Sequence, residues 1–323
     1  MKFWLMRKHI NTKGRPPKEM NTTPVLLISF NRPQYLEKRL IELIVNENVK
    51  SIIVSLDFHS DAMTKRYEEI FEKFESSQVQ LSVVKHQQNI GLAKHIPAAV
   101  EQALQQHVHI IVIEDDIVIG PGSIKSFERA RNILDSDPEI LTIGGYRYSP
   151  WLLSSIFENR WTKTDYFSAW GWMTSREKWE FFRMALKDEN VQNTFENQHR
   201  NLNLTESQKR KWINRFLKCQ MYEERTWDIP VQYWTFKHGK KHVLPIFRMF
   251  ENEGFGNNES TNTKSMRPKW MGKFRTYNSV IEPKMANRIT SRLFNIIDSF
   301  SIGNDRDASK LKLIGRLMRN EIE

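Results

Sequence analysis

The first third of the chain alternates short apolar runs with segments of helical spacing. The apolar runs have the length of buried strands and cover residues 25–30, 51–56, 79–84 and 109–113. Helical spacing fills the intervals between them, over residues 34–45, 62–74 and 91–105. Because strands and helices alternate, the pattern predicts βαβ units, a parallel sheet and right-handed crossovers, which is an α/β fold.

Polar clusters directly follow three of these apolar runs. Asn31-Arg32 follows the first run, Asp57 the second, and Glu114-Asp115-Asp116 the fourth. In open α/β sheets, ligands bind outside the carboxyl ends of the strands. The sequence therefore predicts a binding site where these clusters meet.

Beyond residue 120 the alternation weakens. Helical spacing continues over residues 123–134, 177–186, 206–225 and 229–236. Apolar runs at 141–145 and 243–248 predict two more strands, and the polar stretch 251–264, with its glycines and asparagines, predicts a loop. Residues 1–22 are polar and basic, so we expect a flexible N-terminal segment.

The charge balance narrows the class of partner. The chain has 49 Lys+Arg against 38 Asp+Glu, a formal net charge of +11, which favours a nucleotide, a membrane surface or a nucleic acid. Cys219 is the single cysteine, which excludes an intrachain disulfide framework and a Cys-rich zinc module. No apolar run approaches the roughly 18–20 residues that span a bilayer. We therefore expect a cytoplasmic protein.

Residues 271–323 form a basic extension with amphipathic spacing at 289–301 and 309–319. Two interpretations stay open for this helical tail. Either it lies on an anionic surface, as a peripheral contact with the inner face of the cytoplasmic membrane, or it packs on the body of the protein or on a second subunit in a homodimer.

The carboxylates of Glu114, Asp115 and Asp116 stand together at the mouth of a buried strand. They repel one another, which raises their pKa values, and a divalent cation relieves that repulsion. Mg²⁺ and Mn²⁺ prefer oxygen ligands and often bind through one or two carboxylates plus substrate phosphates. The cluster predicts a metal–nucleotide site, with a solvated acidic turn or a helix N-cap as the structural alternatives.

Short stretches of the chain match one enzyme family in the same order: residues 28–33, 54–57, 89–95, 113–116, 169–172 and 227–228. On these residues the chain resembles the GT-A glycosyltransferases, in particular N-acetylglucosaminyltransferase I-like and bacterial polysaccharide-type enzymes. The resemblance covers residues 24–236 and implies a Rossmann-like, mixed and mostly parallel sheet flanked by helices. It implies a nucleotide-sugar-binding half at 23–118 and an acceptor-binding, catalytic half at 119–270.

The resemblance also implies roles on the donor side. Asp116 is the expected ligand of Mn²⁺ or Mg²⁺, while Glu114 and Asp115 bind hydroxyl groups of the ribose and the donor sugar. The other expected contacts of the nucleotide-sugar come from separate segments: Arg32 at the nucleotide or phosphate, Asp57 at the base, Lys94 and His95 at the nucleotide, and Trp172 under the sugar.

Each of these assignments has a structural alternative. Asp57 fits a strand-end turn, Arg32 a surface arginine, His95 a hydrogen-bonded core histidine and Trp172 a core ring. The loop at 252–255, Asn-Glu-Gly-Phe, resembles an Asn-x-Gly-Phe loop of the bacterial enzymes, but the histidine that often follows it is missing through residue 270.

Asp228 is the expected general base. In an inverting transfer, a carboxylate takes the proton from the acceptor hydroxyl as this oxygen attacks the anomeric carbon. Trp227 would place an apolar wall beside this carboxylate and so raise its pKa. The alternative role is a helix N-cap, because Asp228 stands before Ile229-Pro230.

The sequence thus predicts a metal-dependent, inverting glycosyltransferase. It would move a hexose such as N-acetylglucosamine from a UDP-linked donor to a glycan or lipid-linked acceptor in polysaccharide synthesis. A nucleotidyltransferase is the first alternative, but the turn at Asn31-Arg32-Pro33 lacks the glycines of a phosphate loop. A non-catalytic basic protein that binds membranes or nucleic acid is the second, and the acidic strand end argues against nucleic acid.

Overall fold

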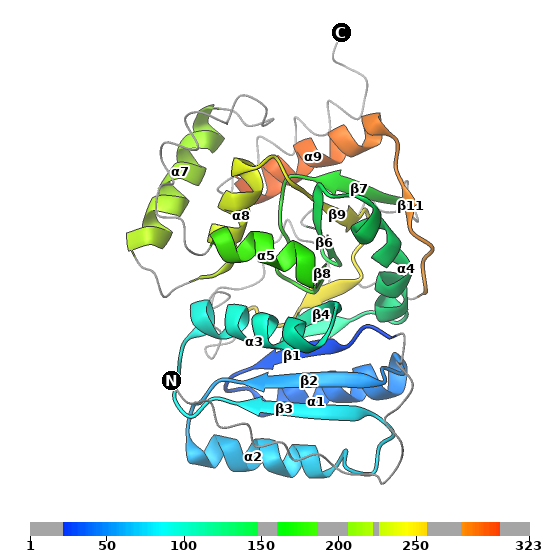
Figure 1. Cartoon of the computed structure of the whole chain (residues 1–323), viewed down its shortest axis with the longest axis vertical. Helices are drawn as coiled ribbons and strands as arrows, with labels where there is room; N and C mark the ends of the chain where they lie inside the picture. Colours follow the sequence, from blue (N-terminus) through cyan, green and yellow to red (C-terminus); the bar gives the residue numbers. More distant parts are fainter. Residues whose placement is uncertain (1–21, 148–159, 186–205, 222–225, 257–278, 304–323) are drawn as a thin grey trace.

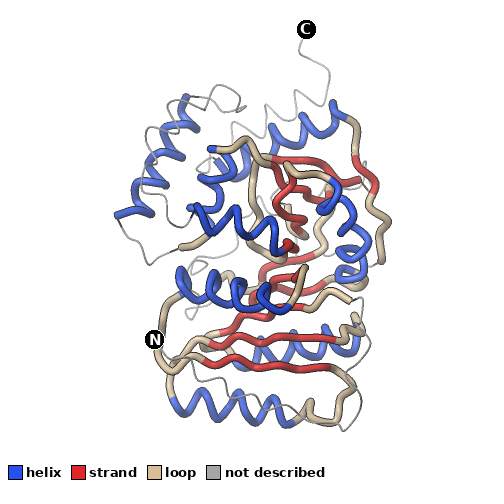
Figure 2. Tube along the Cα trace, viewed as in Figure 1, coloured by secondary structure: helices blue, strands red, loops and turns tan. Residues whose placement is uncertain are grey.

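The structure is a computed structural model that describes residues 22–147, 160–185, 206–221, 226–256 and 279–303. The expected flexible segment, up to residue 21, and the second half of the basic tail, from residue 304, lie outside the described residues. The described part forms one body around a central sheet, with helices on its outside (Figures 1 and 2).

The sheet has nine strands in the order β11-β7-β9-β6-β8-β4-β1-β2-β3. Its parallel half consists of β1 (Val25–Ser29), β2 (Ser51–Leu56), β3 (Gln80–Lys85) and β4 (His109–Glu114). β1 pairs in parallel with both β2 and β4, and β2 pairs in parallel with β3. These four strands confirm the βαβ prediction.

The helices of this half cover opposite faces of the sheet: α1 (Pro33–Ile41), α2 (Asp61–Glu72) and α3 (Leu92–Gln106). Successive side chains of β1 point to opposite faces. Val25 and Leu27 join the core beneath α1 and α2, while Leu26 and Ile28 join the core beneath α3. A strand buried on both faces needs a continuous apolar run, and for this reason β1 could be predicted from the sequence.

The second half of the sheet is mixed. Its strands are β6 (Ile140–Gly144), β7 (Arg160–Thr164), β8 (Trp172–Ser175), β9 (Lys241–Pro245) and β11 (Lys284–Met285). Its helices are α4 (Ser123–Ser136), α5 (Arg176–Ala185), α7 (Glu206–Met221) and α8 (Asp228–Lys237). β8 runs antiparallel to both β4 and β6, whereas β6 and β9 are parallel. The expected mixed, mostly parallel sheet flanked by helices is confirmed.

Two strands of three residues each were not predicted from the sequence. β5 (Ile117–Ile119) pairs antiparallel with β10 (Phe250–Asn252), and β10 begins just before the stretch that was expected to be a loop from residue 251. A strand this short shows no periodicity, and its partner lies far away in the chain. β7 and β8 were also not predicted, because their buried threonines and their aromatic residues do not form an apolar run.

The helix α9 (Arg288–Gly303) corrects one interpretation of the basic tail. It packs on β7, where Phe294 and Ile297 are buried. The Thr164 hydroxyl donates a hydrogen bond of 2.8 Å to Asp298, and Asn295 accepts one of 2.9 Å from the backbone N–H of Asp165. The apolar face of this helix is therefore occupied by the body and is not available to a membrane.

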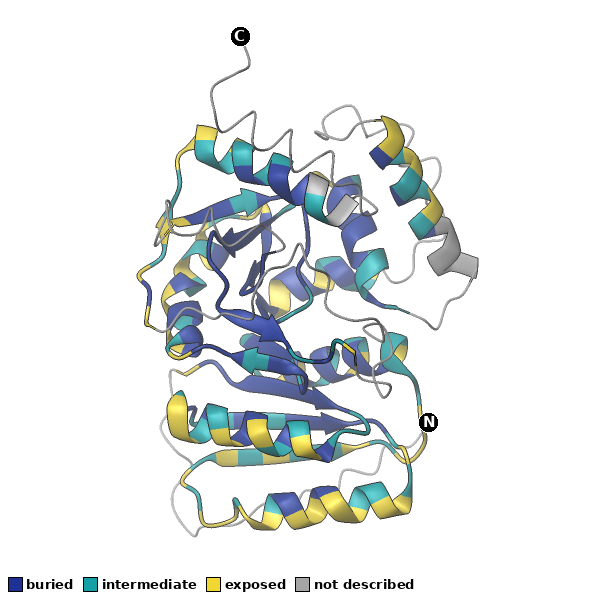
Figure 3. Ribbon diagram, turned by 180° about the vertical axis from the view of Figure 1, so that it is seen from behind, coloured by how far each residue is buried: buried dark blue, intermediate teal, exposed yellow. Residues whose placement is uncertain are grey.

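The burial pattern agrees with this layering. Seen from behind, the strands are buried throughout most of the sheet, while the outer faces of the helices are exposed (Figure 3). No helix in the described ranges combines the length and the apolar character that crossing a bilayer requires.

Two glycines make room for the ring of Phe250 in β10. Gly171 has a φ of +73°, and a Cβ atom there would lie 2.4 Å from the ring; a Cβ atom on Gly145 would lie 2.0 Å from it. The backbone N–H of Gly145 donates a 2.8 Å hydrogen bond to the carbonyl of Gly171. These close contacts seat β10 against the end of the sheet.

Replacing Gly171 with alanine is expected to destabilise the protein for two reasons. The left-handed backbone costs an alanine about 1–2 kcal/mol, and overpacking against Phe250 adds about 1–3 kcal/mol. Gly239→Ala is the matched control, because Gly239 has a φ of +61° with no atom within 4 Å of a new Cβ. Urea unfolding of both variants measures the difference; equal losses would show that the contact with Phe250 carries no energy.

Candidate functional site

The acidic motif lies in the tight turn between β4 and β5. Asp115 and Asp116 are buried, and the backbone N–H of Asp115 donates a 3.0 Å hydrogen bond to the carbonyl of Ile28 at the end of β1. The Ser29 hydroxyl donates a 2.6 Å hydrogen bond to Oδ2 of Asp115. The parallel pairing of β1 with β4 thus places the motif beside the first polar cluster of the sequence, as predicted.

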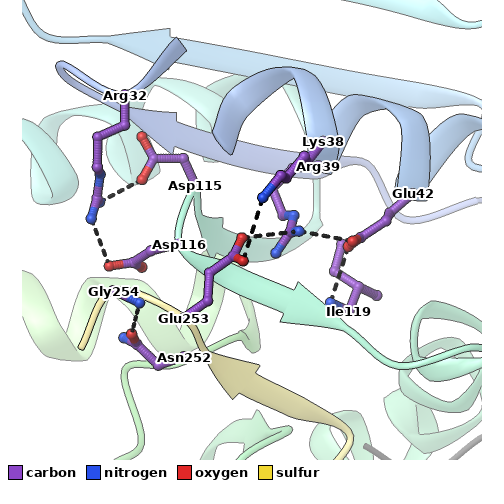
Figure 4. A network of polar contacts seen from close by, with 10 residues as sticks. All are labelled: Arg32, Lys38, Arg39, Glu42, Asp115, Asp116, Ile119, Asn252, Glu253 and Gly254. Carbon is purple, nitrogen blue, oxygen red and sulfur yellow. Dashed lines mark hydrogen bonds and ion pairs between the residues drawn. The ribbon is translucent and has the colours of Figure 1, made fainter. Parts of the chain in front are cut away.

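Arg32 bridges the two aspartates of the motif (Figure 4). Its guanidinium donates to Oδ1 of Asp115 at 2.5 Å and to Oδ2 of Asp116 at 2.9 Å. The backbone N–H of Arg32 donates to the Tyr67 hydroxyl at 3.1 Å, which fixes the turn before α1. With only 12% of its side chain exposed, Arg32 lies against the acidic motif and is not a surface arginine.

The carboxylates of the motif are crowded. Burial raises the pKa of Asp115 to about 6, with Arg32 opposing this shift and Asp116 adding to it. Burial, and next the charge of Asp116, raises the pKa of Glu114 well above its ordinary value. Burial is the main cause of both raised pKa values, and repulsion between the carboxylates adds to it.

Asp228 is the first residue of α8, and its side chain is partly exposed. The Thr226 hydroxyl donates a hydrogen bond to its Oδ1. Burial raises the pKa of Asp228, while the backbone N–H groups of Asp228 and Ile229 oppose the shift. The charge of Asp228 is also a minor cause of the raised pKa of Glu114.

Trp172 occupies a different place from the one expected. Its ring is 1% exposed and stacks on Trp227, with ring centroids 5.4 Å apart, and on Trp179. This ring is buried in the core, so it does not present a face to a sugar. It supports Trp227, which precedes Asp228. The neighbouring Trp170 keeps some exposure instead.

Asp57 ties the end of β2 to the loop before α3. Its carboxylate accepts backbone N–H groups from Phe58 at 2.9 Å, Ile90 at 3.0 Å and Gly91 at 3.0 Å. The strand-end role is therefore real. A carboxylate has about four acceptor positions, so one further hydrogen bond to a ligand remains possible.

His95 is a core residue. Its Nε2 lies 2.8 Å from the Ser55 hydroxyl, and burial lowers its pKa to about 4, so the ring is neutral at pH 7. This corrects the expectation that the His95 side chain touches the nucleotide. Lys94, one position earlier in the first turn of α3, is exposed.

A concavity lies beside Asp57 at the carboxyl ends of β1, β2 and β3. It is lined by Phe30, Leu56, Asp57, Phe58, His59, Met63, Thr64, Tyr67, Lys85 and His86. Aromatic rings and a few polar groups are the usual lining of a small-molecule site.

The segment after β10 contributes residues that the sequence reasoning did not assign. The backbone N–H of Glu253 donates a 2.9 Å hydrogen bond to the carbonyl of Asp116, and Oδ1 of Asn252 accepts from the N–H of Gly254 at 2.7 Å. The Asn-x-Gly-Phe resemblance pointed to this loop, but nothing in the local sequence placed it under the acidic motif.

The donor chemistry of the motif suits a hard divalent cation. Within the described ranges, no three or more His, Cys, Asp or Glu side chains converge as a complete metal cage. Mg²⁺ and Mn²⁺ do not need one, since they bind through one or two carboxylates and take the remaining ligands from phosphates and water. Asp116, backed by Asp115, offers that partial set of oxygens.

A family profile and a relative of known activity both match this chain, and both are of the N-acetylglucosaminyltransferase type. The sequence profile of the GNT-I family matches residues 6–191, more than half of the chain. An alpha-1,3-mannosyl-glycoprotein 2-beta-N-acetylglucosaminyltransferase of Arabidopsis thaliana is 26% identical over 99 residues, which cover 28% of this chain. The match spans only 20% of that relative's own length.

Distant structural similarity is found to solved structures, among them the following two. A mannosyltransferase of Pyrobaculum calidifontis, in complex with GDP-Man and Mn²⁺, has a TM-score of 0.38 and 13% identity, covering 67% of this chain and 68% of its own. The glucosyl-3-phosphoglycerate synthase of Mycobacterium tuberculosis, in complex with Mn²⁺, UDP and phosphoglyceric acid, has a TM-score of 0.30 and 15% identity, covering 48% and 56%.

Proposed function

Because the chain belongs to the GNT-I family, we propose that it is a metal-dependent, inverting glycosyltransferase with a UDP-linked sugar as its donor. The acceptor is a glycan or a lipid-linked sugar. The observation that carries the proposal is the ion-paired cluster at the end of β4, where the Arg32 guanidinium joins Asp115 and Asp116. The charge of Asp228, at the start of α8, also acts on the neighbouring Glu114.

The donor side of the site uses Asp116 and Arg32. Asp116 would hold Mn²⁺ or Mg²⁺, and Glu114 and Asp115 would accept hydrogen bonds from the ribose and the donor sugar. When bound, the divalent cation neutralises charge on the diphosphate as the bond to the sugar breaks. Arg32 adds a guanidinium, which suits bidentate binding of phosphate oxygens.

The nucleotide base would occupy the concavity beside Asp57. The remaining acceptor position of Asp57 would take a hydrogen bond from an N–H of uracil. The rings of Phe30 and Tyr67 in the lining provide apolar contact. Lys94 is exposed near the same loop and would add positive charge toward the phosphates.

Asp228 would act on the acceptor side. Its carboxylate takes the proton of the acceptor hydroxyl while that oxygen forms a bond to the anomeric carbon. The bond from this carbon to the diphosphate oxygen breaks, and its electron pair leaves with the diphosphate. Attack from the face opposite the leaving group inverts the anomeric configuration. The net charge of +11 also favours work near an anionic membrane, where lipid-linked acceptors lie.

A donor screen tests the proposal. The purified protein is incubated with Mn²⁺ and, in separate reactions, with UDP-, GDP- and CMP-sugars, and release of the free nucleotide is measured with and without acceptor glycans. We expect release from a UDP-sugar that depends on Mn²⁺ and rises with acceptor. Preference for GDP- or CMP-sugars would overturn the choice of base, and no release from any donor would overturn the enzymatic function.

A further inference from the structure

The main chain of Asp116 is held from below by the segment after β10. β10 pairs with β5 so that Asn252 lies opposite Ile117, and the next residue, Glu253, donates its backbone N–H to the carbonyl of Asp116 at 2.9 Å. The position of Asp116 therefore depends on where Glu253 is fixed.

Glu253 is fixed by α1. Its Oε1 lies 3.3 Å from Nη2 of Arg39, whose side chain is 2% exposed, and its Oε2 lies 3.7 Å from Nζ of Lys38, which is 55% exposed (Figure 4). A surface lysine at that distance contributes little. Among the described residues, Oε1 of Glu253 is buried without a hydrogen-bond donor, so the charge of Arg39 is what compensates its burial.

The helix α1 thus contacts the acidic motif by two routes. At its start, the Arg32 guanidinium binds the carboxylates of Asp115 and Asp116. Near its end, Arg39 reaches the carbonyl of the same Asp116 through Glu253. A rigid helix that holds both the side chain and the main chain of one residue restricts its orientation.

We propose that the Arg39–Glu253 ion pair is a positioning pair, which holds Asp116 in the orientation that binds the metal–nucleotide. The inference rests on the proposed function. Neither Arg39 nor Glu253 needs to touch the substrate, because the pair acts through the backbone of Asp116. Groups that orient a metal ligand from outside typically change metal affinity by about 10- to 100-fold when they are replaced.

A matched variant at Glu42 distinguishes a positioning role of the pair from a purely structural one. This residue binds the same Arg39, at 2.8 Å, and its other oxygen accepts the N–H of Ile119 at the far end of β5. Glu42→Gln disturbs the same arginine and the same strand, yet it leaves the link from Glu253 to Asp116 intact. It should lower stability without changing metal affinity.

The test measures Mn²⁺ binding by electron paramagnetic resonance of the free ion, at saturating UDP, for the wild type, Glu253→Gln and Glu42→Gln. Circular dichroism first establishes that each variant is folded. We expect Glu253→Gln to raise the Kd for Mn²⁺ by about 10-fold or more. Glu42→Gln should stay within about twofold of the wild type, and Glu253→Asp, which keeps the charge, should be intermediate. Added Mn²⁺ should restore the activity of Glu253→Gln.

The outcomes separate the two proposals. Wild-type binding of Mn²⁺ with an unchanged Kd in Glu253→Gln overturns the positioning pair alone. Equal weakening in Glu253→Gln and Glu42→Gln also overturns it, because general destabilisation then explains the loss. Absence of Mn²⁺ binding by the wild type overturns the proposed function itself. If Glu253→Gln does not fold, Glu253→Asp supplies the comparison with Glu42→Gln.

Discussion

Replacing Asp228 with asparagine is expected to lower kcat by about 10²- to 10⁴-fold, the usual contribution of a general base. Asparagine keeps the shape of the side chain, and its oxygen can still accept from the backbone N–H groups at the start of α8, so the helix should form normally. What it loses is the ability to accept a proton. The measurement is steady-state transfer with the donor found in the screen, together with urea unfolding.

The pH profile gives the same prediction an independent readout. The base works as the carboxylate, and burial raises its pKa above the ordinary value of 3.8. Wild-type kcat should therefore fall as the pH drops through this raised pKa, and the residual activity of Asp228→Asn should lack that acidic limb.

Asp61→Asn is the matched control for this loss. Asp61 is likewise the first residue of a helix, α2, but it is exposed and outside the site. Its replacement should leave kcat unchanged. If Asp228→Asn retained wild-type kcat with its acidic limb, Asp228 would have only a structural role at the start of α8 and another group would have to take the proton.

Replacing Asp116 with asparagine is expected to abolish the stabilisation that Mn²⁺ and UDP together give the folded protein. A ligand present at 100 times its Kd stabilises the native state by about 2.7 kcal/mol, and a site that no longer binds loses all of it. Thermal unfolding with UDP alone, Mn²⁺ alone and both measures the effect. The variant should show the same unfolding temperature in every condition.

The control for Asp116 is Asp135, an aspartate of α4 that contacts the opposite end of β4. Asp135 is bound to His109, the first residue of β4, at 2.6 Å, far from the acidic motif. Asp135→Asn should keep the full response to Mn²⁺ and UDP. A response that survived in Asp116→Asn would mean that the cation binds elsewhere, and the assignment of the acidic motif would then be wrong.

The parallel half of the fold was predictable because local chemistry decides it. The interiors of β1 and β4 are continuous apolar runs, which only strands covered on both faces require. The position of the acidic motif was predictable for the same reason, since a run of three carboxylates marks the end of a buried strand. β5 and β10 were not predictable, because strands of three residues are stabilised by their partner and not by their own pattern.

The burial of individual side chains also could not be predicted from the sequence. Trp172 and His95 were both assigned to the donor site, yet the structure buries each of them in the core. A polar or aromatic residue next to a motif can point to either face of its element, and the choice follows from the strand register and the helix that covers it. The buried Trp172 has a structural role instead, because its ring stacks on Trp227, the residue before Asp228.

By itself, the sequence determined the four parallel strands, the helices between them and the position of three carboxylates at a strand end. These features follow from hydrophobic period and charge within short segments. Only the tertiary structure decided which charges meet: Arg32 with Asp115 and Asp116, and Arg39 with Glu253. Such pairs join segments separated by many residues, and they depend on strand order and register, which no local pattern of residues encodes.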